Sequence, residues 1–207
     1  RNFLEPTPFA GRLVIIGFGA VAQGVLPLLF RHLTLRPEQV RIITADACGI
    51  EEATAYGVGH RILPLTCGNY REIMAPLVGP GDFVLNLAVN VSSVALIEFC
   101  RERGALYLDA SIEPWEGGYT DPALTPSARS NYALREQAKA LNVPGGPTAV
   151  LTHGANPGWV SHFVKQALLD VARDCGVRVV VPGDRHGWAR LAQALSLKVI
   201  HVAERDW

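Results

Sequence analysis

The sequence has no excess of charge of either sign. Nineteen Lys and Arg residues balance nineteen Asp and Glu residues, which gives a formal net charge of +0 at pH 7. Binding to nucleic acid or to an anionic membrane surface usually requires a strongly basic surface, so we expect neither partner. Only 18% of the residues are charged and 49% are hydrophobic. This composition is typical of an α/β protein whose helices cover both faces of a sheet.

Cysteine is also scarce. The four cysteines are Cys48, Cys67, Cys100 and Cys175, and no CxxC pair occurs among them. Zinc frameworks and disulfide scaffolds need closely spaced cysteines, so we expect reduced, mostly buried thiols, no metal site and a cytoplasmic location. His153 and His162 lack a metal-binding motif such as HExxH, and we expect them to be structural. No N-terminal stretch has the features of a signal peptide.

The most informative stretch that is present begins at residue 13. Four β-favouring aliphatic residues, 13–16, run into Gly17 and Gly19, and a helix-compatible segment follows. A dinucleotide-binding fingerprint has this order of buried strand, tight turn and helix start. Gly17 would allow the turn, Gly19 would let a pyrophosphate approach the backbone, and Ala22 would let helix and strand pack closely. The predicted cofactor contacts are Gly17, Gly19, Ala20, Val21 and Ala22.

The same stretch allows a second interpretation. Residues 13–30 carry no charged side chain and are about long enough to cross a bilayer. Glycines, Gln23 and Pro27 interrupt the run, and no second hydrophobic span flanks it, so we favour a protein without membrane contact. Pro27 should kink the helix expected over residues 20–33 or shift its start.

Asp46 follows the second expected strand, residues 40–45. An acidic side chain at this point, about twenty residues beyond the glycine motif, accepts hydrogen bonds from the adenosine ribose in dinucleotide-binding domains. No Arg or Lys follows immediately, as the 2′-phosphate of NADP would require, so the sequence favours NAD. Asp46 would alternatively serve as a turn or helix-capping residue.

Strand-like and helix-like segments alternate up to residue 152, which predicts a Rossmann-type, doubly wound parallel sheet. The expected strands are residues 12–17, 40–45, 61–65, 83–87, 105–109 and 149–152. The expected helices are residues 20–33, 50–57, 69–78, 92–104 and 130–141. Ligands of such sheets bind beyond the carboxyl ends of the strands. The polar side chains at these ends include Asn86, Asn90, Asp109, Ser111 and Glu113.

Beyond residue 152 we expect a helix over residues 158–173 and strands over residues 177–181 and 197–202. Asn156 lies at a strand-to-helix junction, where its amide would contact the nicotinamide or a substrate nitrogen. The Asn156-Pro157-Gly158 segment would equally serve as a turn with proline at the first helical position.

Two loops combine carboxylates with an indole. One holds Glu113, Trp115 and Glu116, and the other spans residues 204–207. Carboxylates and aromatic faces together bind organic cations, so these loops favour a dicationic substrate over an anionic one. In the alternative interpretation they are solvated loop charges beside tryptophans that pack in the core.

Six segments together resemble the bacterial homospermidine synthases of the saccharopine dehydrogenase-like group. They are residues 16–24, 43–46, 86–90, 108–115, 153–158 and 201–206, and they include Leu108-Asp109-Ala110-Ser111-Ile112-Glu113-Pro114-Trp115 and His153-Gly154-Ala155-Asn156-Pro157-Gly158. These later motifs are more specific than the glycine turn. The resemblance implies an NAD-binding Rossmann domain over residues 1–152. It also implies the beginning of an α+β substrate and dimerisation domain over residues 153–207, within a longer, homodimeric enzyme.

The resemblance further implies an NAD-dependent transferase. Putrescine would be oxidised to an imine and ammonia would leave. A second diamine, putrescine or spermidine, would then condense, and the retained NADH would reduce the new imine to homospermidine or its analogue. By resemblance, Asn86 and Ser111 are further cofactor residues, Asn156 and Glu204 are catalytic residues that handle the substrate amine, and Glu113 and Trp115 bind substrate.

Two other functions stay open. A saccharopine or carboxynorspermidine dehydrogenase-type oxidoreductase would act on carboxylated substrates, which need an Arg or Lys clamp; the strand-end loops offer carboxylates instead, with Arg205 as the exception. A non-catalytic NAD-binding module would bind the nucleotide without turning over any diamine.

Overall fold

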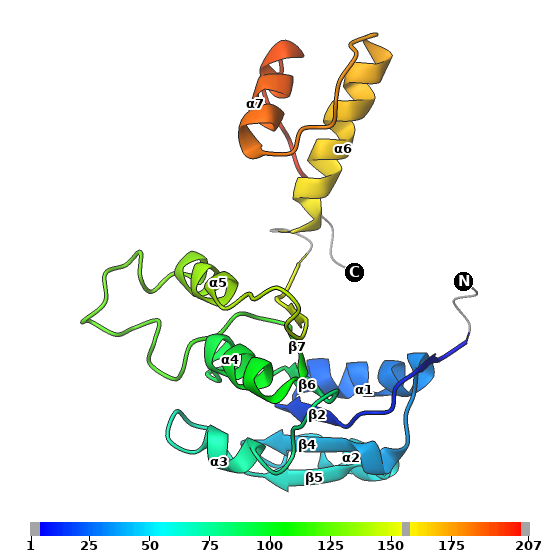
Figure 1. The fold of residues 1–207 in the computed structure, drawn as a ribbon, viewed down its shortest axis with the longest axis vertical. Helices are drawn as coiled ribbons and strands as arrows, with labels where there is room; N and C mark the ends of the chain where they lie inside the picture. Colours follow the sequence, from blue (N-terminus) through cyan, green and yellow to red (C-terminus); the bar gives the residue numbers. More distant parts are fainter. Residues whose placement is uncertain (1–4, 155–157, 204–207) are drawn as a thin grey trace. The chain divides into compact units, whose positions relative to one another are not determined.

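The computed structural model describes residues 5–154 and 158–203 (Figure 1). The chain divides into two compact units, residues 1–152 and residues 153–207. The substrate and dimerisation roles expected for the second unit stay predictions.

Six parallel strands form the main sheet of the first unit, in the order β5-β4-β2-β6-β7-β8. Their bounds are β2 Leu13–Ile16, β4 Val40–Thr44, β5 Gly59–Ile62, β6 Phe83–Asn86, β7 Leu106–Asp109 and β8 Ala149–Val150. Numbered along the chain, this is the 3-2-1-4-5-6 order of the Rossmann fold. The predicted doubly wound parallel sheet is therefore confirmed.

Helices cover both faces of this sheet. They are α1 Ala20–His32, α2 Ile50–Ala55, α3 Tyr70–Met74, α4 Ser93–Arg103 and α5 Asn131–Ala140. Successive strand residues point to opposite faces. One apolar cluster accordingly contains Val14 and Ile16 with Met74 of α3, Leu96 of α4 and Ala138 of α5. The other contains Leu13 and Ile15 with Leu26 of α1 and Ala53 of α2.

The uncharged residues 13–30 do not form one continuous helix. They divide into β2, the glycine turn and most of α1. Pro27 lies inside α1, and it does not shift the start of the helix, which still begins at Ala20. In the part of the chain that the structure describes, no helix is both long enough and apolar enough to cross a membrane.

The third strand starts earlier than expected, because β5 covers Gly59–Ile62 instead of residues 61–65. Pro64 has no N–H group to donate to the neighbouring strand, which explains why pairing stops before it. A short parallel pair of β1 Thr7–Pro8 with β3 Leu33–Thr34, and the 3₁₀ turn η1 Pro37–Gln39, were not predicted.

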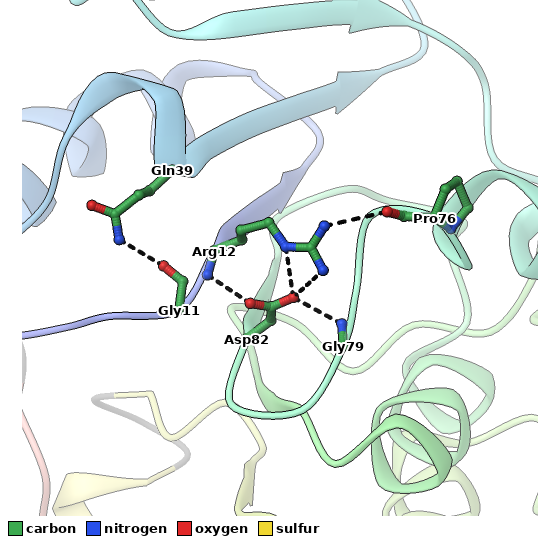
Figure 2. Close-up of polar contacts among 6 residues, drawn as sticks. All are labelled: Gly11, Arg12, Gln39, Pro76, Gly79 and Asp82. Carbon is green, nitrogen blue, oxygen red and sulfur yellow. Dashed lines mark hydrogen bonds and ion pairs between the residues drawn. The ribbon is translucent and has the colours of Figure 1, made fainter.

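An ion pair joins the amino ends of β2 and β6. Arg12 Nη2 and Asp82 Oδ2 lie 2.7 Å apart, and the Arg12 backbone N–H donates to Asp82 Oδ1 over 2.7 Å (Figure 2). The Gly79 N–H donates to Asp82 Oδ2 over 2.8 Å, so both oxygens of this buried carboxylate accept hydrogen bonds. Close by, the buried Gln39 side chain donates to the Gly11 carbonyl over 2.8 Å.

The second unit contains α6 Trp159–Asp174 and α7 Arg185–Ala194, which pack through Leu168, Ala172 and Leu191. The helix expected over residues 158–173 is confirmed. The strands expected over 177–181 and 197–202 are wrong, because both segments are irregular, and α7 was not predicted. A strand needs a hydrogen-bonded neighbour. Within residues 158–203 no strand is available to pair with them, so the predicted α+β character is not observed there.

Candidate functional site

A groove of about 700 Å³ opens at the carboxyl ends of the strands in the first unit. It is lined by residues 16–19 at the end of β2, 43–46 and 48 at the end of β4, 63–67 after β5, 87–91 after β6, and 115–116 beyond β7. The strand order reverses between β2 and β6 (Figure 1). Open parallel α/β sheets bind their ligands in the crevice at such a reversal.

Gly17 makes the sharp turn out of β2. Its φ is +80°, a left-handed conformation that favours glycine. A Cβ at this position would lie 2.7 Å from the Cα of Ala88, so the residue must also be small to let the loop after β6 approach. Its N–H donates to the Ile43 carbonyl over 2.8 Å, which joins the turn to β4.

Gly19 caps α1 and faces open space. A Cβ built there meets no atom within 4 Å, and no side chain caps the helix. The first-turn N–H groups, including those of Ala20 and Val21, therefore lie at the positive end of the helix dipole without a capping side chain. Ala22 is 1% exposed and packs between helix and sheet. This turn fits the diphosphate of a dinucleotide: it offers N–H donors and leaves room beside the backbone.

Asp46 is exposed and lines the same groove. Its Oδ1 accepts a hydrogen bond of 2.9 Å from the Cys48 N–H, which is the turn role considered in the sequence. Gln23 donates to the Phe18 carbonyl over 2.9 Å and to the Cys48 sulfur over 3.4 Å. Gln23 therefore ties the Asp46 loop to the glycine turn. The turn role leaves the second carboxylate oxygen of Asp46 available to a ribose.

Asn86 and Ser111, the two cofactor residues predicted from resemblance, do not line the groove. Asn86 is buried, and its side chain contacts Val91 and Tyr107. The Ser111 hydroxyl donates to Glu113 Oε1 over 2.8 Å. Their contact with the cofactor stays a prediction that no observed geometry supports.

The acidic, aromatic loop after β7 reaches the groove in part. Trp115 and Glu116 line it, whereas Glu113 does not. The Trp115 ring packs on Tyr70, with 5.2 Å between ring centroids. Sequence reasoning missed Glu116 as a site residue, although it placed this side chain in the acidic cluster. It also missed the loop after β5, where a search of every strand end would have found Thr66 and Cys67.

Three of the four cysteines are exposed, so the expectation of mostly buried thiols is wrong. Cys48 and Cys67 lie on strand-end loops that line the groove, where no core covers them. Cys175 is also exposed, at the end of α6. Only Cys100 lies in the core, and burial raises the pKa of its thiol to about 12.

The two predicted catalytic residues, Asn156 and Glu204, lie outside the described residues. In the second unit, His153 and His162 approach each other with 5.0 Å between ring centroids. Over residues 5–154 and 158–203, no group of three or more His, Cys, Asp or Glu side chains is arranged to hold a metal ion.

Comparison with known proteins identifies the relatives of this fold. Residues 13–150 match the family described as the saccharopine dehydrogenase NADP binding domain. The chain belongs to this family. It is 49% identical over 201 residues to a homospermidine synthase of Blastochloris viridis, covering 95% of this chain and 42% of that protein. It is 40% identical over 203 residues to a homospermidine synthase of Mesorhizobium japonicum, with the same coverage.

Among solved structures, this family member is similar to the crystal structure of the homospermidine synthase from Legionella pneumophila in complex with NAD. The TM-score is 0.75 and the identity 39%, over 91% of this chain and 39% of that one. The resemblance to homospermidine synthases predicted from the sequence is confirmed. The chain spans 42% of the length of the curated relatives it matches.

Proposed function

We propose that the full-length protein is a homospermidine synthase, which transfers an aminobutyl group between diamines with NAD as a recycled cofactor. The observation that carries this proposal is the 49% identity to a homospermidine synthase along 95% of the chain. The position of the groove at the strand reversal supports it independently.

In this proposal the first-turn N–H groups of α1 bind the pyrophosphate above Gly19, and Asp46 accepts hydrogen bonds from the adenosine ribose. Bound NAD supplies a hydride acceptor for the amine-bearing carbon of putrescine and later returns the hydride. The family description names NADP, but the carboxylate of Asp46 would repel a 2′-phosphate. We therefore propose NAD, the nucleotide held by the solved relative.

The diamine carries two positive charges, and the side chains of the loop after β7 suit it. Glu116 and Trp115 line the groove and would attract an ammonium group by charge and by the indole face. Glu113, held by Ser111, would orient the substrate from beside the groove. Asn156 and Glu204 would handle the reacting amine, which must lose a proton before hydride leaves its carbon.

We further propose that the enzyme is a cytoplasmic homodimer whose partners are putrescine and spermidine. Neither nucleic acid nor a membrane is needed for this function, in keeping with the balanced charge of the chain.

The test is turnover of C1-deuterated putrescine by the full-length protein with NAD. A homospermidine synthase should yield homospermidine and ammonia without accumulating NADH. The product should also retain the deuterium, because the same cofactor returns it. Binding of NAD without any turnover would instead indicate a non-catalytic module.

A second function, an oxidoreductase of the saccharopine dehydrogenase type, is favoured by the family match itself. Such an enzyme would release NADH steadily and act on carboxylated substrates such as saccharopine or carboxynorspermidine. Offering these substrates in parallel with putrescine separates the two functions.

Glu204→Gln should reduce diamine turnover by at least about tenfold while NAD affinity changes little, because it removes one charge from the substrate side. Glu72→Gln, an exposed carboxylate on α3, is the matched control. Equal losses of turnover and NAD binding in Glu204→Gln would indicate a folding defect and remove Glu204 from the site.

A further inference from the structure

A chain of buried polar side chains lies at the carboxyl ends of β6 and β7. Asn86, Tyr107 and Asp109 are each 1–2% exposed. The Asn86 amide donates to Tyr107 Oη over 3.3 Å, and the Tyr107 hydroxyl donates to Asp109 Oδ2 over 3.1 Å. Among the described residues, no cationic side chain forms an ion pair with Asp109. Burying three polar side chains costs more free energy than burying apolar side chains at the same positions.

One end of this chain holds a loop of the groove. Asn86 Oδ1 accepts from the Ala88 N–H over 3.3 Å, and Asn86 Nδ2 also donates to the Val91 carbonyl over 3.3 Å. Residues 87–91 line the groove, and Ala88 is the residue against which Gly17 packs. Asn90 in this loop has a φ of +60°, which needs support from its surroundings.

At the other end of this chain of side chains, Asp109 binds the last residue of the first unit. Asp109 Oδ1 accepts a hydrogen bond of 2.8 Å from the N–H of Thr152. Thr152 is the last residue of that unit, and the segment that carries Asn156 follows it in the chain. The three side chains therefore connect the groove loop to the residue at which the first unit ends.

The pKa shifts of Tyr107 and Asp109 bear on which of the two side chains carries the proton in the hydrogen bond between them. Burial raises the pKa of Tyr107 well above its ordinary value, and the charge of Asp109 raises it further, so the hydroxyl stays protonated and donates. Burial also raises the pKa of Asp109. Hydrogen bonds from the Thr152 N–H, the Ser93 side chain and the Tyr107 hydroxyl oppose this rise, and the charge of Glu113 adds to it.

We propose that Asn86, Tyr107 and Asp109 are positioning residues that hold the loop of residues 87–91 in the conformation that receives the nicotinamide half of the cofactor. The proposal rests on the proposed NAD-dependent function. Asp46 follows β4 and this loop follows β6, on opposite sides of β2. The network therefore acts on one half of the dinucleotide, and the adenosine half binds independently of it.

Tyr107→Phe in the full-length protein tests this role, with Asp109→Asn as a second variant. Tyr107→Phe keeps the ring and removes two hydrogen bonds, the one accepted from Asn86 and the one donated to Asp109. Asp109→Asn keeps the shape of the side chain and replaces one acceptor oxygen with an amide donor. The dissociation constant for NAD should rise about threefold to tenfold. That of AMP, measured by competition with NAD, should stay within about twofold of wild type. Calorimetry gives both constants, and circular dichroism confirms that each variant is folded.

Asp82→Asn is the matched control, because Asp82 is a buried carboxylate at the opposite edge of the same sheet. It should lower the melting temperature and leave both nucleotide affinities unchanged. Unchanged NAD affinity in Tyr107→Phe and Asp109→Asn overturns the proposal. The proposal is also overturned if NAD and AMP affinity fall together in all three variants, in proportion to the fall in melting temperature. Failure of the wild-type protein to bind NAD would instead overturn the proposed function.

Discussion

A buried carboxylate lies at each end of the strands of the main sheet, Asp82 at the amino ends (the amino edge) and Asp109 at the carboxyl ends (the carboxyl edge). The two carboxylates have different hydrogen-bond and charge partners. At the amino edge, Asp82 pairs with the guanidinium of Arg12 and accepts two backbone N–H groups (Figure 2). At the carboxyl ends of the strands, the described residues that donate to Asp109 are neutral, and they include the Tyr107 hydroxyl and the Thr152 N–H. The first network joins β2 and β6 directly. The second holds a groove loop and the end of the unit.

We interpret the Asp82 network as stabilising the fold and the Asp109 network as positioning the groove loop. An ion pair with backbone donors neutralises a buried charge, and removing one partner destabilises the fold because it leaves the other charge unpaired. Neutral donors leave the carboxylate charge uncompensated beside the strand ends, which is costly for folding. Polar groups that weaken stability yet are fully hydrogen-bonded are typical of sites that preorganise a ligand.

Gly19→Ala should have the largest effect on the carboxyl edge. The new methyl group meets no protein atom within 4 Å, so folding should be unchanged, but it occupies the space proposed for the pyrophosphate. The dissociation constant for NAD should rise by about tenfold or more, measured by calorimetry. Gly24→Ala, which also has open space, is the control. Unaltered NAD affinity in Gly19→Ala would show that the glycine turn is not the nucleotide site.

Asp82→Ala should have the largest effect on the amino edge. It leaves Arg12 and the Gly79 N–H without their partner, a loss of roughly 1–3 kcal/mol in stability. The melting temperature should fall by several degrees, and NAD affinity should not change. A coupled loss of NAD affinity would mean that the two edges are not functionally separate.

Asp46→Ala should raise the dissociation constant for NAD by about fivefold to tenfold, because a charged acceptor of the ribose hydroxyls is lost. Asp121→Ala is the matched control, since both residues accept an N–H from two residues further on, over 2.9 Å. Asp46→Asn retains the turn acceptor and removes the charge. If Asp46→Asn binds NAD as wild type does while Asp46→Ala does not, the side chain serves the turn alone.

The smallest effect concerns pH. Burial raises the pKa of Asp109, so the folded protein holds this proton more tightly than the unfolded chain. Stability from this group is therefore greatest at low pH and falls as pH rises from the ordinary carboxyl value through the raised one. The nearby charge of Glu113 acts in the same direction. As pH rises through this window, the melting temperature of the wild type should fall relative to that of Asp109→Asn, which cannot titrate at this position. A constant difference between the two melting temperatures would contradict the prediction.

Local signals in the sequence predicted most of the first unit. The aliphatic run before Gly17 predicted β2, and the helix that follows begins at Ala20 as expected. Ser92 and Gly104 bounded α4 correctly, since the Ser92 hydroxyl accepts from the Ala95 N–H and Gly104 adopts a left-handed conformation. Such caps act within a few residues, so they can be read without the fold.

The second unit shows where local signals fail. Residues 177–181 are rich in valine and favour a strand, yet Val180 is 93% exposed and irregular. β-Propensity describes how a side chain fits a paired, half-buried surface, and no such surface is available within the described residues. The helix α7, capped by Asp184, has a mixed composition whose apolar face becomes evident only when it packs on α6.

The sequence by itself determined the Rossmann class, the glycine turn and the acidic residue after the second strand, because each depends on neighbours a few residues away. Only the tertiary structure decided which strand ends meet, that Asn86 and Tyr107 are buried beneath a groove loop, and that Asp109 holds Thr152. These contacts join residues that are tens of positions apart. Strand order and register determine which residues meet, and a local sequence pattern specifies neither of them.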